Sequence, residues 1–240
     1  MANESAVRAG ERRRYGQYCG LAAGLDVIGE RWTLLIVREL LIGPQRYNEL
    51  LHNLPGIGTN LLAERLRWLT RQGVIRQHPR SNGKGHSYEL TRFGEGLREP
   101  ILGLARWGLN VPHPFDAEDE VRPQWGVLAV EALIRRDQIP EVDESYEFLV
   151  DDQVFHIAVK DRRISVHQEG AERAALRVST DAKTFVDIGS GRISPFEAVA
   201  TRRLTLEGEQ EALTRCSRLL GLLPGDGPAG ATRESSGTRG

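Results

Sequence analysis

The 240-residue sequence predicts an α+β protein made of two structured parts. Three observations favour this fold class. Helix-like segments dominate the front half and lead into two short strand-like segments, a segment rich in Pro, Asp and Glu spans residues 110–123, and strand-like and helix-like segments follow it. With 40% hydrophobic residues, each part can bury a core of its own.

Four helices are expected in the first 73 residues, because apolar residues recur there at helical spacing. Their expected ranges are 17–28, 32–41, 46–53 and 58–72. Gly43-Pro44 ends the second helix and Pro55 ends the third, since proline cannot continue the ladder of backbone hydrogen bonds. Gly73 ends the fourth.

The fourth expected helix has two distinct faces. Leu62, Leu66 and Leu69 lie at the spacing that buries one stripe of a helix. The opposite stripe carries polar side chains that emerge together, namely Asn60, Glu64, Arg67 and Arg71. The helix can therefore pack through one face and contact DNA through the other.

Two strands are expected directly after this helix, over residues 74–78 and 86–90. The glycine-rich loop between them and the start of the second strand carry Arg80, Lys84 and His86, which suit a minor groove or a row of phosphates. A solvated hairpin with ordinary surface charges is the alternative for the loop alone. Joined to the preceding helices, the strand pair predicts a winged helix-turn-helix DNA-binding domain.

The two halves of the chain differ in charge. Residues 1–113 hold 16 Lys and Arg against 10 Asp and Glu, a net charge of +6, whereas residues 114–240 hold 16 against 23, a net charge of -7. Cationic side chains release counterions from a phosphate backbone and carboxylates repel it, so the front half is the expected DNA-binding half. Residues 1–14 are expected to form a flexible basic arm in which Arg12, Arg13 and Arg14 can reach phosphates.

The sequence also argues against several classes of protein. No apolar run reaches the length of a membrane span, and the first 16 residues lack the apolar core of a signal peptide, so we expect a cytoplasmic protein. Cys19 and Cys216 are too few for a disulfide framework. The six histidines show no metal-ligand spacing, and the chain has neither a nucleophile elbow nor a phosphate-binding loop. We therefore expect no catalysis, no metal and no cofactor.

A fifth helix is expected over residues 91–109. This helix and the first one are candidates for the seam of a homodimer, because a domain this small has limited core for them to cover. The side chains assigned to the seam are Leu21, Leu25, Leu97, Ile101, Leu104 and Trp107. Packing of either helix against its own domain is the alternative.

The rear half is expected to contain an antiparallel meander with one covered face, because its residues partly alternate between apolar and polar. The four strands of the meander are expected over residues 146–150, 154–160, 163–168 and 175–180. A helix over 125–136 precedes them, and two helices, a strand and a helix follow over 183–188, 195–200, 203–206 and 209–222. The expected domains are therefore 15–110 and 124–222, with a linker over 111–123 and a disordered tail over 223–240.

Across residues 15–110 the chain resembles the HxlR family of winged-helix transcription regulators. The matching segments are Cys19, Gly29–Ile36, Arg38–Leu41, Arg46–Leu50, Leu54–Ile57, Asn60–Leu62, Arg65-Leu66, Leu90-Thr91 and Trp107-Gly108. Two positions depart from the family pattern: Gly20 follows Cys19 where proline is usual, and Gly58-Thr59 stands where many members have Ser-Pro. With this resemblance, we expect a homodimeric regulator that binds a pseudo-palindromic operator in double-stranded DNA.

Specific roles follow from the expected winged helix. Thr59 and Asn60 lie at the start of the reading helix, nearest the base edges, where an amide side chain can pair with adenine. Arg67 lies on the same face and suits guanine or phosphate. The side chains assigned to the DNA backbone are Arg46, Arg65, Arg71, Arg80 and Lys84. Arg65 lies near the apolar edge of the helix, so a structural ion pair is the alternative for it.

From about residue 125 to 222 the chain resembles the sterol carrier protein 2 fold, a lipid-transfer module. The clearest segments are Leu176–Asp181, Gly189–Pro195 and Arg203–Gly208. Similar domains enclose an apolar tunnel between sheet and helices, which implies a hydrophobic small-molecule effector for this chain. The side chains assigned to its pocket are Phe148, Phe155, Ile157, Phe185 and Ile188. The alternative is that these residues only form the core of the domain.

A different function to consider is thiol-based redox sensing with a purely structural rear domain. Cys19 is expected at the first turn of a helix near the basic arm, where the helix dipole and the cations favour the thiolate. A small buried residue at the dimer seam is the alternative for Cys19.

Overall fold

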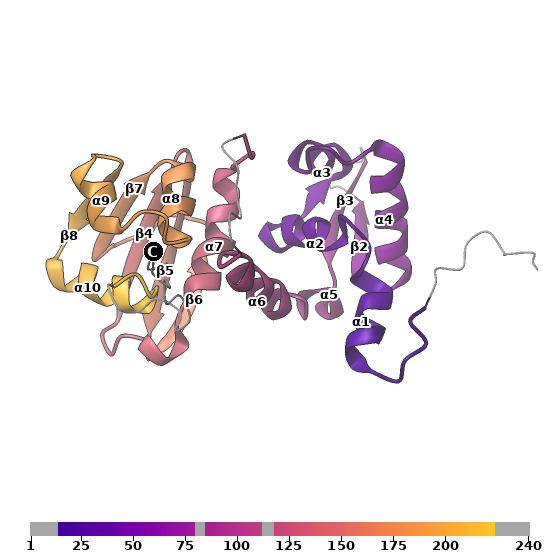
Figure 1. Ribbon diagram of the computed structural model, residues 1–240, viewed down its shortest axis with the longest axis horizontal. Helices are drawn as coiled ribbons and strands as arrows, with labels where there is room; N and C mark the ends of the chain where they lie inside the picture. The colour runs from indigo at the N-terminus through magenta and orange to yellow at the C-terminus, as the bar shows by residue number, and fades with distance from the viewer. Residues whose placement is uncertain (1–13, 80–84, 112–117, 224–240) are drawn as a thin grey trace, which may run out of the picture. The chain divides into compact units, whose positions relative to one another are not determined.

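The computed structural model describes residues 14–79, 85–111 and 118–223, and Figure 1 shows its helices and strands. The chain divides into two compact units, Met1–Ile101 and Leu102–Gly240. Within the described ranges, none of the helices combines the length and the apolar character needed to cross a lipid bilayer.

The front unit contains helices and a small antiparallel sheet. Its elements are α1 (Gly20–Ile28), α2 (Thr33–Ile42), β1 (Gln45–Arg46), α3 (Tyr47–Asn53), α4 (Thr59–Arg71), β2 (Ile75–Pro79), β3 (His86–Leu90), α5 (Arg92–Glu95) and the start of α6 (Arg98–Gly108). The strands lie in the order β1-β3-β2. This arrangement confirms the predicted winged helix-turn-helix class, with β1 as an added edge strand that the sequence analysis missed.

The predicted end of α4 at Gly73 is confirmed by its hydrogen bonds. Gly73 has a φ of +70°, its N–H donates to Thr70 O at 3.1 Å, and the N–H of Val74 donates to Leu69 O at 3.0 Å. These two bonds form a Schellman motif, which satisfies the last carbonyls of the helix and turns the chain into β2.

The prediction of one helix over residues 91–109 is wrong, because the segment forms α5 and α6 separately. Thr91 caps α5, with the N–H of Gly94 donating to Thr91 Oγ1 at 3.1 Å. Pro100 lacks an N–H and would clash with a carbonyl one turn earlier inside a continuous helix. It is tolerated in the first turn of a helix, so the second helix begins afresh at Arg98.

The core of the front unit lies between α2, α4 and the strands. Its fully or almost fully buried side chains include Ile36, Val37, Leu50, Leu54, Leu62, Leu66, Leu69, Val74 and Ile75. The leucine stripe predicted for α4 therefore faces this core. Its opposite face is left to solvent.

The rear unit is built around one sheet. Its elements are η1 (Pro123–Trp125), α7 (Gly126–Leu133), η2 (Arg136–Gln138), β4 (Glu144–Val150), β5 (Gln153–Lys160), β6 (Arg163–His167), β7 (Leu176–Thr180), α8 (Ala182–Gly189), α9 (Pro195–Ala200), β8 (Leu204–Gly208) and α10 (Gln210–Leu219). The predicted turns between β4 and β5 and between β5 and β6 are confirmed, with positive φ at Asp151, Asp161 and Arg162.

The five strands lie in the order β6-β5-β4-β7-β8. The sheet is mostly antiparallel, as predicted, but β7 pairs in parallel with β4 instead of continuing the meander beyond β6. Two contacts hold β7 there: the N–H of Ala175 donates to Ser145 O at 2.9 Å, and Arg177 Nε donates to Glu147 Oε1 at 2.9 Å. The chain therefore returns across the sheet after β6, which makes β4 the central strand.

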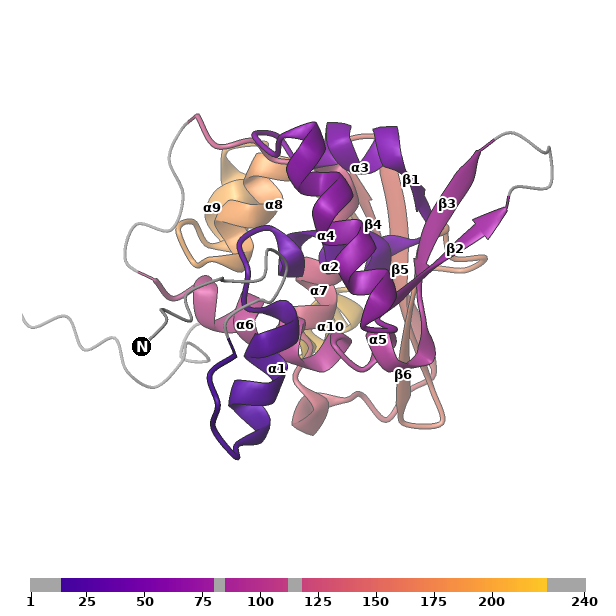
Figure 2. The same cartoon turned by 90° about the vertical axis from the view of Figure 1, so that its right-hand side faces the viewer.

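One face of this sheet is apolar and covered. Alternate residues of β4, β5 and β7 are buried, namely Tyr146, Phe148, Val150, Phe155, Ile157, Val159, Leu176 and Val178. Figures 1 and 2 show α7, α8, α9 and α10 gathered on one side of the strands. The domain thus has two layers, with its core between the sheet and the helices.

Candidate DNA interface and apolar cavity

The turn between α3 and α4 is anchored on α2. Gly56 in this turn has a φ of +87°, and a β-carbon built on it would lie 3.5 Å from Cη2 of Trp32. Trp32 is itself left-handed, with a φ of 76°, and immediately precedes α2. The positive φ favours glycine at position 56, while the 3.5 Å separation is an ordinary van der Waals contact that packs the turn against the indole ring. The turn therefore gives α4 a defined starting point.

A side chain from α3 also fixes the beginning of α4. The hydroxyl of Tyr47 donates to Thr59 O at 2.7 Å. Thr59 is the first residue of α4, and the N-cap, Gly58, offers no side chain to cap the helix. Tyr47 thus supplies a contact at the end of the helix where Thr59 and Asn60 are exposed.

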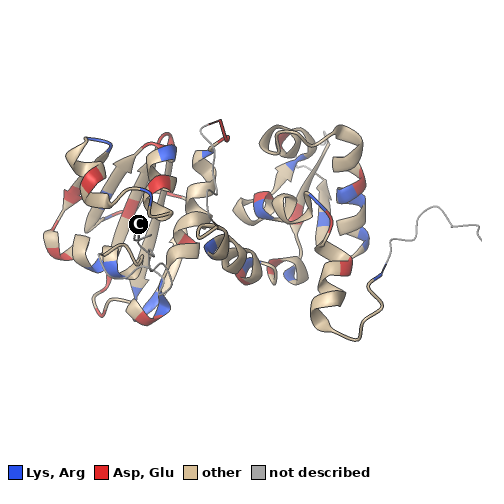
Figure 3. Cartoon of the chain, viewed as in Figure 1, with Lys and Arg blue, Asp and Glu red and all other residues tan. Residues whose placement is uncertain are grey.

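The outward face of α4 presents the polar residues that the sequence predicted. Thr59, Asn60, Arg67 and Arg71 are all exposed. Among the described residues, no hydrogen bond or ion pair engages the guanidinium of Arg67. The guanidinium of Arg71 lies over the ring of Trp68, 5.6 Å from its centroid. Figure 3 shows Lys and Arg positions along this helix.

Arg65 does not belong to that exposed face. Its side chain is buried, with Nη2 3.0 Å from Glu30 Oε2 and Nη1 2.8 Å from Glu64 Oε1. The guanidinium therefore ties α4 to the segment before α2, which is the structural ion pair considered as the alternative. Arg65 lies one residue from the leucine stripe, so its side chain is drawn inward.

Arg46 in β1 and His86 in β3 are exposed. Arg46 is also the N-cap of α3, where its N–H donates to Glu49 Oε2 at 2.6 Å and its Nε lies 3.5 Å from Glu49 Oε1. Arg80 and Lys84, the predicted contacts of the loop tip, lie outside the described residues.

Strand β2 carries two further basic groups that the sequence analysis missed. Arg76 Nε contacts Glu89 Oε1, and His78 Nε2 lies 2.7 Å from the same oxygen. Slight desolvation would raise the pKa of Glu89, but Arg76 and His78 together hold it below its usual value. The sequence pattern could have predicted this pair, because residues two apart on a strand share one face, which places Arg76 and His78 side by side.

The side chains assigned to a dimer seam are largely uncovered. Leu21 is 72% exposed, Trp107 68% and Leu104 49%, and Leu25 is exposed as well. Leu97 and Ile101 are partly buried. Large apolar groups this open to water on two helices are a common feature of surfaces that pair with another chain.

Cys19 is exposed at the N-cap of α1. The backbone N–H groups of Ala22 and Leu21 in the first turn lower the pKa of its thiol, against a smaller opposing effect of desolvation. The first turn of a helix stabilises a thiolate in this way because its N–H groups lack helical partners.

The rear unit contains a cavity of about 60 Å³. Its walls come from α7, β4, β7, α8, the start of α9, β8, α10 and the turn after α10. The lining residues are Val130, Leu133, Phe148, Leu176, Val178, Phe185, Ile188, Gly189, Pro195, Leu204, Leu206, Leu213, Cys216, Ser217, Leu220 and Leu222. The cavity is almost wholly apolar.

Three of the five predicted pocket residues line this cavity, namely Phe148, Phe185 and Ile188. Phe155 and Ile157 do not, because they lie on β5, while the cavity lies over β4, β7 and β8. Phe155 instead stacks on Phe148, with 5.4 Å between ring centroids. The contribution of α10 was not predicted, although Leu213 and Cys216 in the helix and Leu220 at its C-cap recur at helical spacing.

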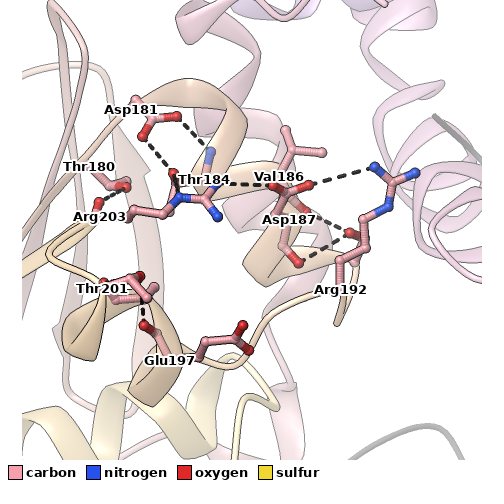
Figure 4. A network of polar contacts seen from close by, with 11 residues as sticks. Thr180, Asp181, Thr184, Val186, Asp187, Arg192, Glu197, Thr201 and Arg203 are labelled. Atoms are coloured by element: carbon pink, nitrogen blue, oxygen red, sulfur yellow. Dashed lines mark hydrogen bonds and ion pairs between the residues drawn. The ribbon is translucent and has the colours of Figure 1, made fainter. Parts of the chain in front are cut away.

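A polar network joins α8 to the segment that leads into β8, as Figure 4 shows. Asp187 is buried and contacts two arginines: its Oδ2 lies 3.2 Å from Nη2 of Arg203, and its Oδ1 lies 3.6 Å from Nη1 of Arg192. Arg203 Nε donates to Thr184 Oγ1 at 3.0 Å, and Thr184 in turn donates to Asp181 Oδ2 at 2.5 Å. The network holds both ends of α8.

A second buried network ties α10 to β4. Arg215 forms a bidentate ion pair with Glu144, in which Nε donates to Oε1 and Nη2 donates to Oε2, both at 2.6 Å. The hydroxyl of Tyr146 also donates to Glu144 Oε1. Burial would raise the pKa of Glu144, but the hydrogen bonds from Arg215 and Tyr146 and the charge of Arg215 hold it below its usual value. Burial also raises the pKa of the neighbouring Cys216 thiol, which stays neutral.

Two family models match the chain. The model described as HxlR-like helix-turn-helix matches residues 27–114, and the model described as the SCP-2 sterol transfer family matches residues 128–221. The two matches fall on the front and rear parts in the order that the resemblances implied.

Known relatives align with the front part. An uncharacterised HTH-type transcriptional regulator of Mycobacterium tuberculosis is 40% identical over 104 residues, which cover 43% of this chain and 64% of that relative. The uncharacterised HTH-type regulator YdeP of Bacillus subtilis is 35% identical over 105 residues, 43% of this chain and 82% of that relative. A solved structure, the reduced form of the transcriptional regulator YodB from B. subtilis, is 26% identical to this chain, with a TM-score of 0.37. The match covers 42% of this chain and 100% of the YodB chain.

Proposed function

The chain belongs to the HxlR-like helix-turn-helix family, and from this premise we propose that it regulates transcription as a homodimer on a pseudo-palindromic operator. The observation that carries the proposal is the outward face of α4. This face presents Asn60, Arg67 and Arg71 to solvent on a helix whose start is fixed by Tyr47. A helix of this kind enters the major groove with its first turn nearest the bases.

We assign separate roles to the residues of this surface. Thr59 and Asn60 read base edges, Arg67 contacts guanine or phosphate, and Arg71 contacts the DNA backbone. Arg46, Arg80, Lys84 and His86 complete the backbone contacts, and Arg76 joins them through its exposed side chain. Arg65 is not part of the proposed surface, because its side chain is only 9% exposed and is paired with Glu30 and Glu64, whereas the Arg76 side chain is 61% exposed.

Replacing Asn60 with alanine is expected to relax sequence preference, whereas Arg71→Ala is expected to weaken binding to all sequences alike. Loss of a base contact costs roughly 1–3 kcal/mol at one base pair, while loss of a phosphate contact flattens the salt dependence by about one unit of log-log slope. Fluorescence anisotropy on the operator and on scrambled duplexes, at several salt concentrations, measures both effects.

Lys160→Ala is the matched control, because Lys160 is an exposed cation of the rear unit. It should leave affinity and salt slope unchanged. Equal, uniform losses for Asn60→Ala and Arg71→Ala would contradict the proposed division of roles.

For the remainder of the chain we propose a sensor arrangement. Residues 15–110 form the DNA-binding and dimerisation domain, residues 111–123 a linker, and residues 124–222 a domain that binds a hydrophobic effector. The apolar cavity of the rear unit supports this assignment, since its lining residues offer an organic ligand almost only apolar contacts. An effector changes DNA affinity only through unequal binding to two states of the dimer.

A second candidate function, redox sensing, is favoured by the exposure and lowered pKa of Cys19. A thiolate attacks hydrogen peroxide at oxygen, which gives a sulfenic acid on Cys19 and releases hydroxide. We expect mild peroxide to reduce operator binding by the wild-type protein and to spare Cys19→Ser. The measurement is anisotropy before and after treatment, with dithiothreitol restoring the signal. Identical responses of the two proteins would remove Cys19 from the mechanism.

A further inference from the structure

The cavity of the rear unit is small for the function proposed for it. Its volume is about 60 Å³. Ligand pockets for organic molecules are several times larger, at roughly 300–1,000 Å³. A ligand of more than a few heavy atoms therefore enters only if part of the wall moves.

One side of the wall is strongly held. Ile188, Gly189 and Pro195 line the cavity from α8 and the start of α9. The loop between these helices is tied to Asp187, whose backbone carbonyl accepts from the N–H of Arg192 at 2.9 Å and whose carboxylate contacts Arg192 and Arg203 (Figure 4). Moving this side would separate the buried carboxylate of Asp187 from Arg192 or from Arg203, which is costly.

The opposite side ends in a turn after α10. Gly221 has a φ of +65° and donates to Arg218 O at 3.0 Å, and the N–H of Leu222 donates to Ser217 O at 2.8 Å. This Schellman motif folds the chain back, so that the Leu222 side chain lines the cavity. In the described part of the rear unit, two lining residues lie outside a helix or strand, namely Leu220 and Leu222. Of these two, only Leu222 follows a glycine.

We propose that Leu222 is a plug that occupies the ligand site and that an apolar ligand binds by displacing its side chain. The inference rests on the proposed sensor function of the rear domain and names the residue that sets its capacity. Displacement needs rotation about Gly221, the loss of the two turn hydrogen bonds and a shift of the Arg135 side chain that lies against Gly221. The leucines of α10 itself are held by the helix. Leu222 and the ligand therefore compete for the same apolar space.

The test is binding of a neutral apolar fluorophore, N-phenyl-1-naphthylamine, to the full-length protein. Leu222→Ala removes the competing side chain, and the expected result is roughly tenfold tighter binding, the ratio that corresponds to about 1.4 kcal/mol. Leu222→Trp enlarges the plug and is expected to abolish binding. Leu223→Ala is the matched control, since Leu223 is the adjacent leucine and does not line the cavity.

Equal affinities of wild type, Leu222→Ala and Leu223→Ala would overturn the proposal, and so would tighter binding by Leu222→Trp. Absence of binding to both wild type and Leu222→Ala, with thermal unfolding curves that show each protein folded, would overturn it as well. Operator affinity with and without the fluorophore is measured separately. If Leu222→Ala binds the fluorophore tightly but the fluorophore does not change its operator affinity, Leu222 is a plug but the rear domain is not a sensor of operator binding.

Discussion

Replacing Leu21 with aspartate is expected to separate the proposed dimer and to weaken operator binding by roughly a hundredfold or more. Leu21 is 72% exposed, so the protomer loses no core contact, but a carboxylate at an apolar seam would have to give up its hydration. Two linked reading helices bind two half-sites with an effective concentration that raises affinity by about 10²–10⁴. A single protomer lacks this increase in affinity.

The fold of the Leu21→Asp protein should be unaffected, because position 21 lies in the first turn of α1, where a negative charge suits the helix dipole. Sedimentation velocity measures the loss of the dimer, and anisotropy measures the loss of affinity. Val142→Asp is the control, since Val142 is 50% exposed and belongs to the rear unit, which is not assigned to the seam. A Leu21→Asp protein that remains dimeric would refute the assignment of α1 to the seam.

The second large effect is expected at Glu144. Glu144→Gln removes the charge that Arg215 and Tyr146 share, and breaking a buried ion pair costs about 3 kcal/mol. The side chain of Glu144 is only 5% exposed, so solvent screens its charge weakly and most of this loss of stability is expected. The side chain of Arg215 is 26% exposed, so water can hydrate its guanidinium in the variant, which reduces the loss. Chemical denaturation of the full chain, followed through the transition of the rear unit, measures the change.

The effect of Glu144 has a defined dependence on pH. Because the pKa of Glu144 is lower in the folded protein than in the unfolded chain, its stabilisation is fully present above the unfolded value, about 4.3, and is lost as pH falls through the folded value. The difference between wild type and Glu144→Gln should therefore be constant from pH 7 to about 5.5 and shrink below about 4.

Glu141→Gln provides the comparison for this series, because Glu141 pairs with Arg162 on the surface with 80% of its side chain exposed. Exposed pairs of this kind contribute little to stability, so no measurable change is expected. A loss of stability at Glu141 equal to that at Glu144 would show that burial does not determine the effect.

Local features of the fold could be predicted from the sequence. The end of α4 depends on Gly73 and the two bonds around it, and the turn at Asp161-Arg162 depends on two adjacent positive φ values. The leucine stripe of α4 follows from helical periodicity alone. Each of these features is determined by residues a few positions apart, which a pattern in the sequence can reveal.

Features that depend on distant partners could not be predicted. Strand β1 is two residues long and exists because Gln45 and Arg46 pair with β3. Whether Arg65 faces DNA or the core depends on Glu30, 35 residues away. The same limit applies to the pocket: the strand order places β4 beside β7, and that order decides that Phe148 lines the cavity while Phe155 lies behind it. Sequence pattern gives the faces of strands but not their neighbours.

The central position of β4 has a consequence for folding. Strands β4, β5 and β6 are joined by tight turns, so they can pair early, while the partner on the other side of β4 comes from Leu176–Thr180, later in the chain. Until β7 arrives, β4 is an unprotected edge whose apolar residues can recruit strands from other molecules. A fragment that stops before Leu176 would keep that edge open permanently, so any excised rear domain must extend past β8 and α10 to avoid aggregation.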